Sequence, residues 1–119
     1  MTDRRSLGVR GEALAKKYLS AQGYEFLAAN ERVGRLELDL IFRRAAKMIF
    51  VEVKTRRLSG DDDPDAALSQ AQIHKLKRAA HIYAIKNRVS SDAVRLDLIH
   101  ILFNPNTQRA SLRHYKNIF

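Results

Sequence analysis

Two acidic residues and one lysine stand in neighbouring apolar stretches near the middle of the chain. Asp39 lies within LELDLIF, and Glu52 and Lys54 lie in the following stretch, MIFVEVK. If residues 44–47 form a short hairpin loop between two strands, Asp39 lies directly across from Glu52, and Glu37 lies across from Lys54. Three carboxylates and one amine would then share one sheet face, with cross-strand Cβ atoms about 5 Å apart.

The same alternation predicts how the first of these strands divides its side chains between two faces. Leu36, Leu38 and Leu40 form one face, and Glu37 and Asp39 point to the other. The acids are therefore predicted to share a face of their own.

The predicted acidic cluster needs a counter-charge, because closely packed carboxylates repel and burial raises their pKa values. Either Lys54 and nearby arginines neutralise it, or a divalent cation does. Carboxylate oxygens are hard ligands that suit Mg²⁺ or Mn²⁺ better than zinc. A bound cation polarises a phosphoryl oxygen and holds a water that a lysine can orient, so phosphodiester hydrolysis is the natural reaction. The alternative is a surface charge ladder, since Glu-x-Lys alone is a weak motif.

Glu12 is a further acid, in a stretch of residues 6–22 whose apolar positions repeat as in an amphipathic helix. Gly23 is a suitable end for this helix. By position alone, Glu12 is expected to be a surface residue paired with Lys16 one turn later, a contact worth roughly 0.3 kcal/mol. The other interpretation is that Glu12 leans over the sheet as a metal ligand, and the residue pattern by itself favours the surface pair.

The chain is strongly basic, with 22 Lys and Arg against 13 Asp and Glu among 119 residues and a net charge of +9. This balance favours a polyanionic partner, with nucleic acid preferred over a merely solvated basic surface. No basic segment with a large apolar face stands out, no apolar run approaches the ~20 residues of a membrane span, and no signal-peptide pattern opens the chain. The absence of cysteine excludes disulfides, thiolate catalysis and zinc ribbons. A cytoplasmic location without membrane contact is expected.

The cations cluster in sequence around the acids. Arg32 and Arg35 precede Asp39, and Arg56 follows the Glu-x-Lys triplet. Lys75 and Arg78 belong to the cationic face of a second predicted helix. A nucleic-acid backbone needs such a positive rim around a metal-binding centre, so these five residues are the predicted phosphate contacts.

The remaining pattern predicts the order of the elements. Ser69 and Gln72 form an S-x-x-Q capping box, so the second helix is expected to begin near Gln70. Residues 30–34 have turn composition. Further strands are predicted at residues 24–29, 93–103 and 110–115. Helix, three strands, helix, strand and edge strand in 119 residues predict one α/β domain with a mixed sheet and helices packed on it.

Two further patterns are rejected as metal sites. The loop of residues 58–68 contains the run DDDPD, whose spacing lacks the alternating oxygens, central Gly and terminal Glu of a calcium loop. We interpret it as a solvated acidic loop. His74, His81 and His100 do not form a convincing metal set, and His114 is equally unremarkable.

Several of these residues together carry a resemblance that covers nearly the whole chain. The chain resembles the YraN family of small bacterial proteins in GVRGE at residues 8–12, Asn30, ELDLI at residues 37–41 and FVEVKTR at residues 50–56. That family resembles archaeal Holliday-junction resolvases and the PD-(D/E)xK restriction-endonuclease-like superfamily. The resemblance implies a restriction-endonuclease-like αβββαβ core, a mixed β-sheet flanked by helices, in a single endonuclease-like domain over residues 1–119, and a homodimer.

The resemblance also implies roles for four residues. Asp39 and Glu52 match Mg²⁺ ligands, and Lys54 matches the group that positions or activates water. Glu12 matches the helix-borne acid of the resolvases, which reverses the surface interpretation reached from the pattern alone.

Two positions depart from the family pattern. Leu36 stands where the family usually has Gly, and Gln72 where it usually has Lys. The first bears on backbone access beside the acids, and the second removes one phosphate contact.

The sequence supports a leading function and two alternatives. The leading hypothesis is a Mg-dependent nuclease that hydrolyses phosphodiester bonds in DNA, including branched or structured DNA. The first alternative is a non-catalytic nucleic-acid-binding module on a nuclease-like fold. The second is a protein-interaction domain whose positive charge serves solubility.

Overall fold

The computed structural model describes residues 4–58 and 68–118. Within these ranges the helices are α1 (Arg4–Ala21), α2 (Gln70–Lys86) and a short 3₁₀ helix, η1 (Ser91–Ala93). The strands are β1 (Glu25–Val33), β2 (Leu36–Arg44), β3 (Lys47–Arg57), β4 (Val94–Asn104) and β5 (Arg109–Tyr115). The acidic run of residues 61–65, interpreted above as a solvated loop, lies outside the described residues.

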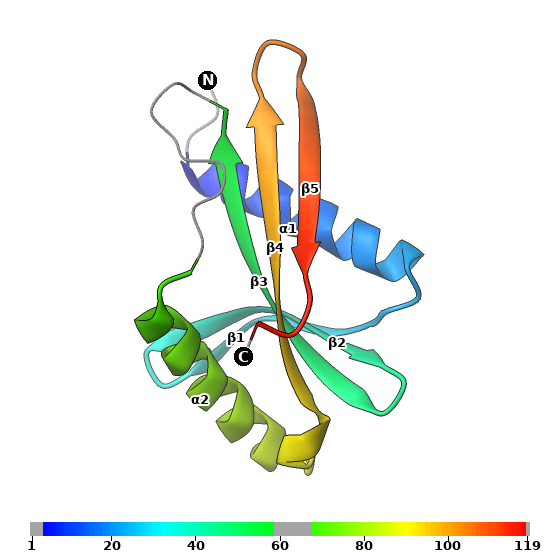
Figure 1. The fold of residues 1–119 in the computed structure, drawn as a ribbon, viewed down its shortest axis with the longest axis vertical. Helices are drawn as coiled ribbons and strands as arrows, with labels where there is room; N and C mark the ends of the chain where they lie inside the picture. Colours follow the sequence, from blue (N-terminus) through cyan, green and yellow to red (C-terminus); the bar gives the residue numbers. More distant parts are fainter. Residues whose placement is uncertain (1–3, 59–67, 119) are drawn as a thin grey trace.

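The strands of the described chain form one mixed sheet in the order β1-β2-β3-β4-β5 (Figure 1). Neighbouring strands are antiparallel except β3 and β4, which run parallel. A parallel pair needs a crossover connection, and α2 lies in it. The order α1-β1-β2-β3-α2-β4 confirms the predicted αβββαβ core with a mixed sheet flanked by helices, and β5 is the predicted edge strand.

The two long helices cover opposite faces of the sheet, and each closes a core of its own. Leu76 of α2 packs in one core with Phe50 and Leu96. Leu19 of α1 packs in the other core with Val51. Adjacent residues of β3 therefore serve different cores, as the period of two in a strand requires. Both faces of β3 and β4 are buried, which explains their nearly unbroken apolar sequences.

The ends of the helices follow local signals. Gln72 N donates to Ser69 Oγ at 3.1 Å and Ser69 N donates to Gln72 Oε1 at 2.9 Å, which confirms the predicted capping box at the start of α2. Gly23 follows α1 with a left-handed φ of +92°, the conformation that glycine adopts most easily after a helix. In the described part of the chain, no helix is both long and apolar enough to cross a membrane.

The first strand is longer than predicted. β1 continues through Asn30 to Val33, and only Gly34 and Arg35 form the turn to β2. Asn30 has a φ of +55° within the strand, a conformation that Asn tolerates better than most residues. Its turn-like residue type therefore marks an irregular strand position and not the end of the strand.

Candidate active site

β2 and β3 pair over only part of their length. Their register runs from Arg44 and Lys47 to Leu40 and Val51, and residues 36–38 of β2 pair with β1 alone. β3 meanwhile continues beside β4 as far as Arg57. The β1–β2 hairpin thus turns away from β3, β4 and β5 (Figure 1). We call the opening between residues 36–39 of β2 and residues 52–57 of β3 the fork.

Asp39 and Glu52 lie where the fork begins. Asp39 Oδ2 accepts a hydrogen bond from the backbone N–H of Val53 at 2.9 Å. The carboxyl groups of Asp39 and Glu52 are also hydrogen-bonded to each other. Because two ionised carboxylates are both acceptors, this contact requires a proton between them when no cation is bound. The structure thus brings together the two acids that the hairpin register places opposite each other.

Burial dominates the electrostatics of this pair. It raises the pKa of Glu52 to about 8, and the charge of Asp39 and the hydrogen bond between the two acids add to the rise, whereas Lys54 opposes it. Burial also raises the pKa of Asp39, although the Val53 N–H and the bond to Glu52 act in the opposite direction. We therefore assign the shared proton to Glu52 and the negative charge to Asp39 at neutral pH.

Glu52 and Lys54 line a cavity of about 220 Å³ between the fork and α2, the fork cavity. α2 contributes Gln72 and Lys75 to its wall, and β2 contributes Leu36. Both positions that depart from the family pattern, Leu36 and Gln72, therefore line the same cavity as Glu52 and Lys54. Gln72 directs its side-chain oxygen to the Ser69 N–H, so it serves the helix cap at the edge of this cavity.

α1 brings Glu12 to the fork from the other face of the sheet. The helix packs so closely on β3 that a Cβ on Gly11 would overlap the hydroxyl group of Thr55. Only glycine permits this approach without a shift of the helix or the strand. Gly11 therefore sets the distance between α1 and β3 at the turn that carries Glu12.

The carboxyl group of Glu12 interacts with the charges of the acids at the fork. Its pKa is raised by burial first, and then by the negative charges of Asp39 and Glu37. Lys16, the partner expected from helical spacing, instead places Nζ 3.8 Å from the centroid of the Phe26 ring. The surface-pair interpretation of Glu12 is therefore wrong.

Asn30 joins the acids from two elements, a role that the sequence did not indicate. With its amide oriented so that Nδ2 faces the acids, Asn30 donates to Glu12 Oε1 and to Glu37 Oε1 at 3.1 Å each. A neutral donor between two carboxylates reduces their repulsion and ties α1 to β2. The available signal is Asn30 itself, one of the positions at which the chain resembles the family, although residues 30–34 have the composition of a turn.

The donor chemistry of the fork suits a hard divalent cation. Asp39 and Glu52 supply adjacent carboxyl groups whose shared proton a cation would displace. No group of three His, Cys, Asp or Glu side chains in residues 4–58 and 68–118 is spaced as a ready-made metal cage. Mg²⁺ does not require one, because it commonly binds through one or two carboxylates and keeps several waters. The residues present therefore fit Mg²⁺ or Mn²⁺.

Comparison with known proteins decides the family. The sequence model of the uncharacterised protein family UPF0102 matches residues 11–101, which include all four predicted site residues. The chain belongs to UPF0102. This is the YraN family that its motifs resemble.

Relatives in UPF0102 match this chain along almost its full length. The UPF0102 protein of Nocardia farcinica is 35% identical over 117 residues, which cover 98% of this chain and 91% of the relative. The UPF0102 protein of Syntrophomonas wolfei is 34% identical over 115 residues, which cover 97% of this chain and 98% of the relative. Among solved structures, Pyrococcus furiosus SfsA in complex with Ca²⁺ is similar with a TM-score of 0.45 and 16% identity. This similarity covers 96% of this chain but only 64% of the SfsA chain.

Two details of the predicted strand geometry are wrong in this UPF0102 protein. Leu38 packs in the core under α2, whereas Leu40 packs in the core under α1, so the leucines of β2 do not share one face. Glu37 does not pair across from Lys54, because β2 and β3 have separated at that point. Both predictions assume a flat ladder of paired strands, whereas β2 twists away from β3 beyond Leu40 and Val51.

The predicted phosphate contacts of the UPF0102 chain lie on β1, β3 and α2 and in the β1–β2 turn. Lys75 lines the fork cavity. Arg78 is exposed on α2, and Arg32 and Arg35 are exposed at the end of the β1–β2 hairpin. Arg56 is half-buried and donates from Nη1 to the carbonyl oxygen of Thr55 at 3.2 Å. Among the five, within the described residues, Lys75 alone borders the cavity that Glu52 and Lys54 line.

Asp97 and His114 form a buried polar network that the sequence did not indicate. Asp97 is fully buried and accepts hydrogen bonds from Arg95 Nε at 2.9 Å, Arg95 Nη2 at 2.7 Å and Asn117 N at 2.9 Å. His114 Nε2 lies 2.7 Å from Asp97 Oδ2, and Arg95 also donates to the Tyr24 hydroxyl at 2.8 Å. The expectation that His114 is unremarkable is wrong, because it helps to hold β5 and the chain after it against β4.

Proposed function

We propose that this UPF0102 protein is a metal-dependent nuclease that hydrolyses phosphodiester bonds in DNA, branched or structured DNA included. The observation that supports it best is the hydrogen-bonded pair of Asp39 and Glu52 at the fork, with Lys54 lining the adjacent cavity. Buried acids of this kind cost folding free energy, and such groups gather where a protein binds or reacts.

The residues of the fork have distinct roles in this proposal. Asp39 and Glu52, with Glu12, would hold Mg²⁺ or Mn²⁺. When bound, the cation supplies positive charge at a phosphoryl oxygen and lowers the pKa of a water. Lys54 donates hydrogen bonds that orient the attacking water or the phosphate. The Val53 N–H holds the Asp39 carboxylate in place, and Asn30 does the same for Glu12.

The basic surface would bind the DNA backbone. Lys75 at the fork cavity, with Arg78, Arg32, Arg35 and Arg56 further out, would contact phosphates. Phosphate contacts position a nucleic acid without reading its sequence, so we propose selection by the shape of the substrate. A cytoplasmic location and a homodimer stay predictions.

The second candidate is a nucleic-acid-binding module that does not cleave. The observation that favours it is the proton shared by Asp39 and Glu52, because a pair with a Glu52 pKa of about 8 keeps this proton at pH 7 and so avoids a second negative charge without a cation. In that case the hydrogen bond between the two acids would only stabilise the sheet where β2 and β3 separate. The basic surface alone would bind nucleic acid.

A substrate panel tests the nuclease proposal. Duplex, single-stranded and four-way-junction DNA are incubated with the protein in Mg²⁺, Mn²⁺ or EDTA. We expect cleavage in either metal and none in EDTA, and a loss of roughly 10² or more in rate for Asp39→Asn and for Lys54→Ala. Two exposed residues provide controls: Glu25→Gln removes a carboxylate, as Asp39→Asn does, and Lys17→Ala removes an ammonium group, as Lys54→Ala does. Both control variants should keep the wild-type rate.

The other outcomes select the other functions. Tight binding that weakens steeply with salt, without cleavage of any substrate in Mn²⁺, selects the binding module. Equal cleavage by wild type and Asp39→Asn contradicts the assigned site. The absence of salt-dependent binding to all three substrates contradicts both nucleic-acid functions.

A further inference from the structure

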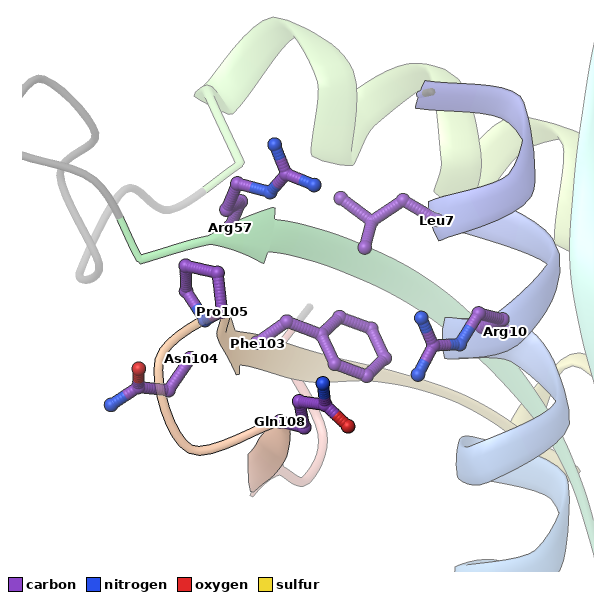
Figure 2. A pocket seen from close by; sticks show the side chains of 7 residues that line it. All are labelled: Leu7, Arg10, Arg57, Phe103, Asn104, Pro105 and Gln108. Carbon is purple, nitrogen blue, oxygen red and sulfur yellow. The ribbon is translucent and has the colours of Figure 1, made fainter. Parts of the chain in front are cut away.

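A second cavity, of about 380 Å³, lies at the end of β3 and β4 that is remote from the β2–β3 turn. Residues of α1, β3, β4 and the turn after β4 line it. Figure 2 shows the ring of Phe103 between Arg57, at the end of β3, and Arg10, on α1. We call this space the arginine cavity.

Its charge suits an anion. Arg10 and Arg57 both line the arginine cavity, and no acidic side chain of the described residues does. Arg10 Cζ lies 4.7 Å from the centroid of the Phe103 ring, a contact that orients the guanidinium plane. Two cations on one cavity repel each other unless an anion lies there. Guanidinium groups bind phosphate through paired hydrogen bonds, so a phosphate group is the fitting anion.

The rest of the wall suits a base better than a bare phosphate. A base can stack on a guanidinium plane, and that of Arg10 is already held over Phe103. The amide side chains of Asn104 and Gln108 also line the cavity and offer both donors and acceptors. The volume of about 380 Å³ lies within the range of about 300–1,000 Å³ of small-molecule sites.

We propose that the arginine cavity binds a nucleoside phosphate, either as an unpaired nucleotide of a DNA strand or as a free nucleotide. The strand form rests on the proposed nuclease function and deepens it, because it names a substrate with an unpaired segment. The free form does not depend on that function.

β3 runs from the fork to the arginine cavity, and α1 carries residues near both. Arg10 precedes Glu12 on α1, and Arg57 follows Glu52 on β3. The segment of β3 from Glu52 to Arg57 spans roughly 17 Å at the rise of a strand. One strand of a duplex carries about five phosphates over that length. A strand whose reacting phosphate lies at the fork therefore reaches the arginine cavity a few nucleotides away.

Two binding measurements in EDTA, which prevents cleavage, test the proposal. The first follows a labelled short single strand by fluorescence anisotropy, and the second follows dAMP by calorimetry, with inorganic phosphate as competitor. We expect Arg57→Gln to weaken both ligands about tenfold. Arg88→Gln removes the same charge from an exposed position beyond α2 and should change either affinity by no more than about twofold.

A second variant at the same position keeps the test decisive if Arg57→Gln disturbs the fold. Arg57→Lys retains the charge but not the paired hydrogen bonds, so we expect an intermediate loss of dAMP affinity. Circular dichroism establishes that each variant is folded. If dAMP binds and the single strand does not, the site is supported with free nucleotide as its ligand.

Three results would overturn the proposal: equal losses in Arg57→Gln and Arg88→Gln, competition by inorganic phosphate as strong as by dAMP, or no binding of either ligand to wild type. Asp39→Asn should bind dAMP as wild type does. Binding of dAMP without any DNA cleavage thus counts against the nuclease proposal alone. Cleavage without binding of dAMP or the single strand counts against the arginine cavity alone.

Discussion

The backbone N–H of Val53 donates to Asp39 Oδ2 at 2.9 Å, at the point where β2 stops pairing with β3. Beyond this point β2 offers no backbone carbonyl to Val53. The Asp39 side chain accepts the hydrogen bond in its place, so the Val53 N–H group keeps a partner. One residue therefore supplies both a candidate metal ligand and the bond that stabilises the opening of the sheet. Substitutions at Asp39 should change stability as well as activity.

Asp39→Ala and Asp39→Asn separate these two contributions. Asp39→Ala leaves the Val53 N–H without its acceptor, and we expect a loss of about 1–3 kcal/mol in the free energy of unfolding. Asp39→Asn keeps an oxygen that can accept this bond and removes one acid from the cluster, so its stability should equal or exceed that of wild type at pH 8. Urea unfolding followed by circular dichroism measures both. Equal stability of the two variants would contradict a structural role for the Asp39–Val53 bond.

Folding stability should decrease as the pH rises toward 8. The pKa of Glu52 rises from 4.5 to about 8 in the folded protein, so the folded state binds the proton more tightly than the unfolded state. Its contribution is complete below pH 4.5 and is lost as the pH passes 8. We expect the free energy of unfolding to fall across this window by at most about 5 kcal/mol, since a tenfold difference in proton affinity is worth about 1.4 kcal/mol. Glu52→Gln cannot titrate there and should give a flatter profile, and parallel profiles of the two proteins would rule out the shared proton.

Magnesium should reverse this loss. A cation that binds only the folded state stabilises it, and it must displace the proton shared by Asp39 and Glu52. The rise in melting temperature on adding Mg²⁺ should therefore be larger at pH 8 than at pH 6, and it should be absent in Asp39→Asn. Sodium chloride at equal ionic strength serves as the control. A rise that is equal in Asp39→Asn would place the cation elsewhere.

Gly11 and Gly8 form a matched pair on α1. A Cβ at Gly11 would overlap Thr55, whereas a Cβ at Gly8 meets nothing within 4 Å. Gly11→Ala should cost about 1–3 kcal/mol through overpacking. Gly8→Ala should instead stabilise the protein by roughly 0.5–1 kcal/mol, since alanine favours a helix over glycine. Thermal unfolding measures both effects, and a stabilising Gly11→Ala would show that α1 does not need this close approach.

If the nuclease proposal holds, Gly11→Ala should also lower the cleavage rate, because a displaced α1 carries Glu12 away from the fork. Gly8→Ala should leave that rate unchanged. A destabilised Gly11→Ala protein with full activity at a temperature where it is folded would remove Glu12 from the site.

The buried Asp97 network should control how the free energy of unfolding changes at acidic pH. Burial alone would raise the pKa of Asp97, but hydrogen bonds from His114, Arg95 and the Asn117 backbone hold it below its ordinary value. The stability that this carboxylate contributes is therefore present above pH 4 and is lost as the pH falls through its folded pKa. Asp97→Asn leaves the Arg95 charge without its carboxylate and should cost about 3 kcal/mol at pH 7.

Asp92→Asn is the control for this substitution, because Asp92 is exposed in η1. Its effect on the free energy of unfolding should stay within about 0.5 kcal/mol. Urea unfolding at pH 7 and pH 4 measures both variants. An Asp97→Asn protein as stable as Asp92→Asn would contradict the structural role of the network.

Local patterns predicted most of the elements. The S-x-x-Q box fixed the start of α2 because its two hydrogen bonds join residues within one turn. The opposition of Asp39 and Glu52 followed from the hairpin, because a two-residue turn sets the register of the strands that it joins. Local patterns fail where contacts join distant elements. The composition around Asn30 predicts a turn, whereas its partners, Glu12 and Glu37, lie on other elements.

By itself, the sequence determined the family, the αβββαβ order and the pairing of Asp39 with Glu52, because these depend on motifs and on spacing along one hairpin. Only the tertiary structure decided that the sheet opens at Asp39, that Leu40 packs in the core under α1, and that Glu12 lies near the acids of the fork. These features depend on strand twist and on the approach of α1 through Gly11, and neither the twist nor the distance between packed elements is encoded in any single stretch of residues.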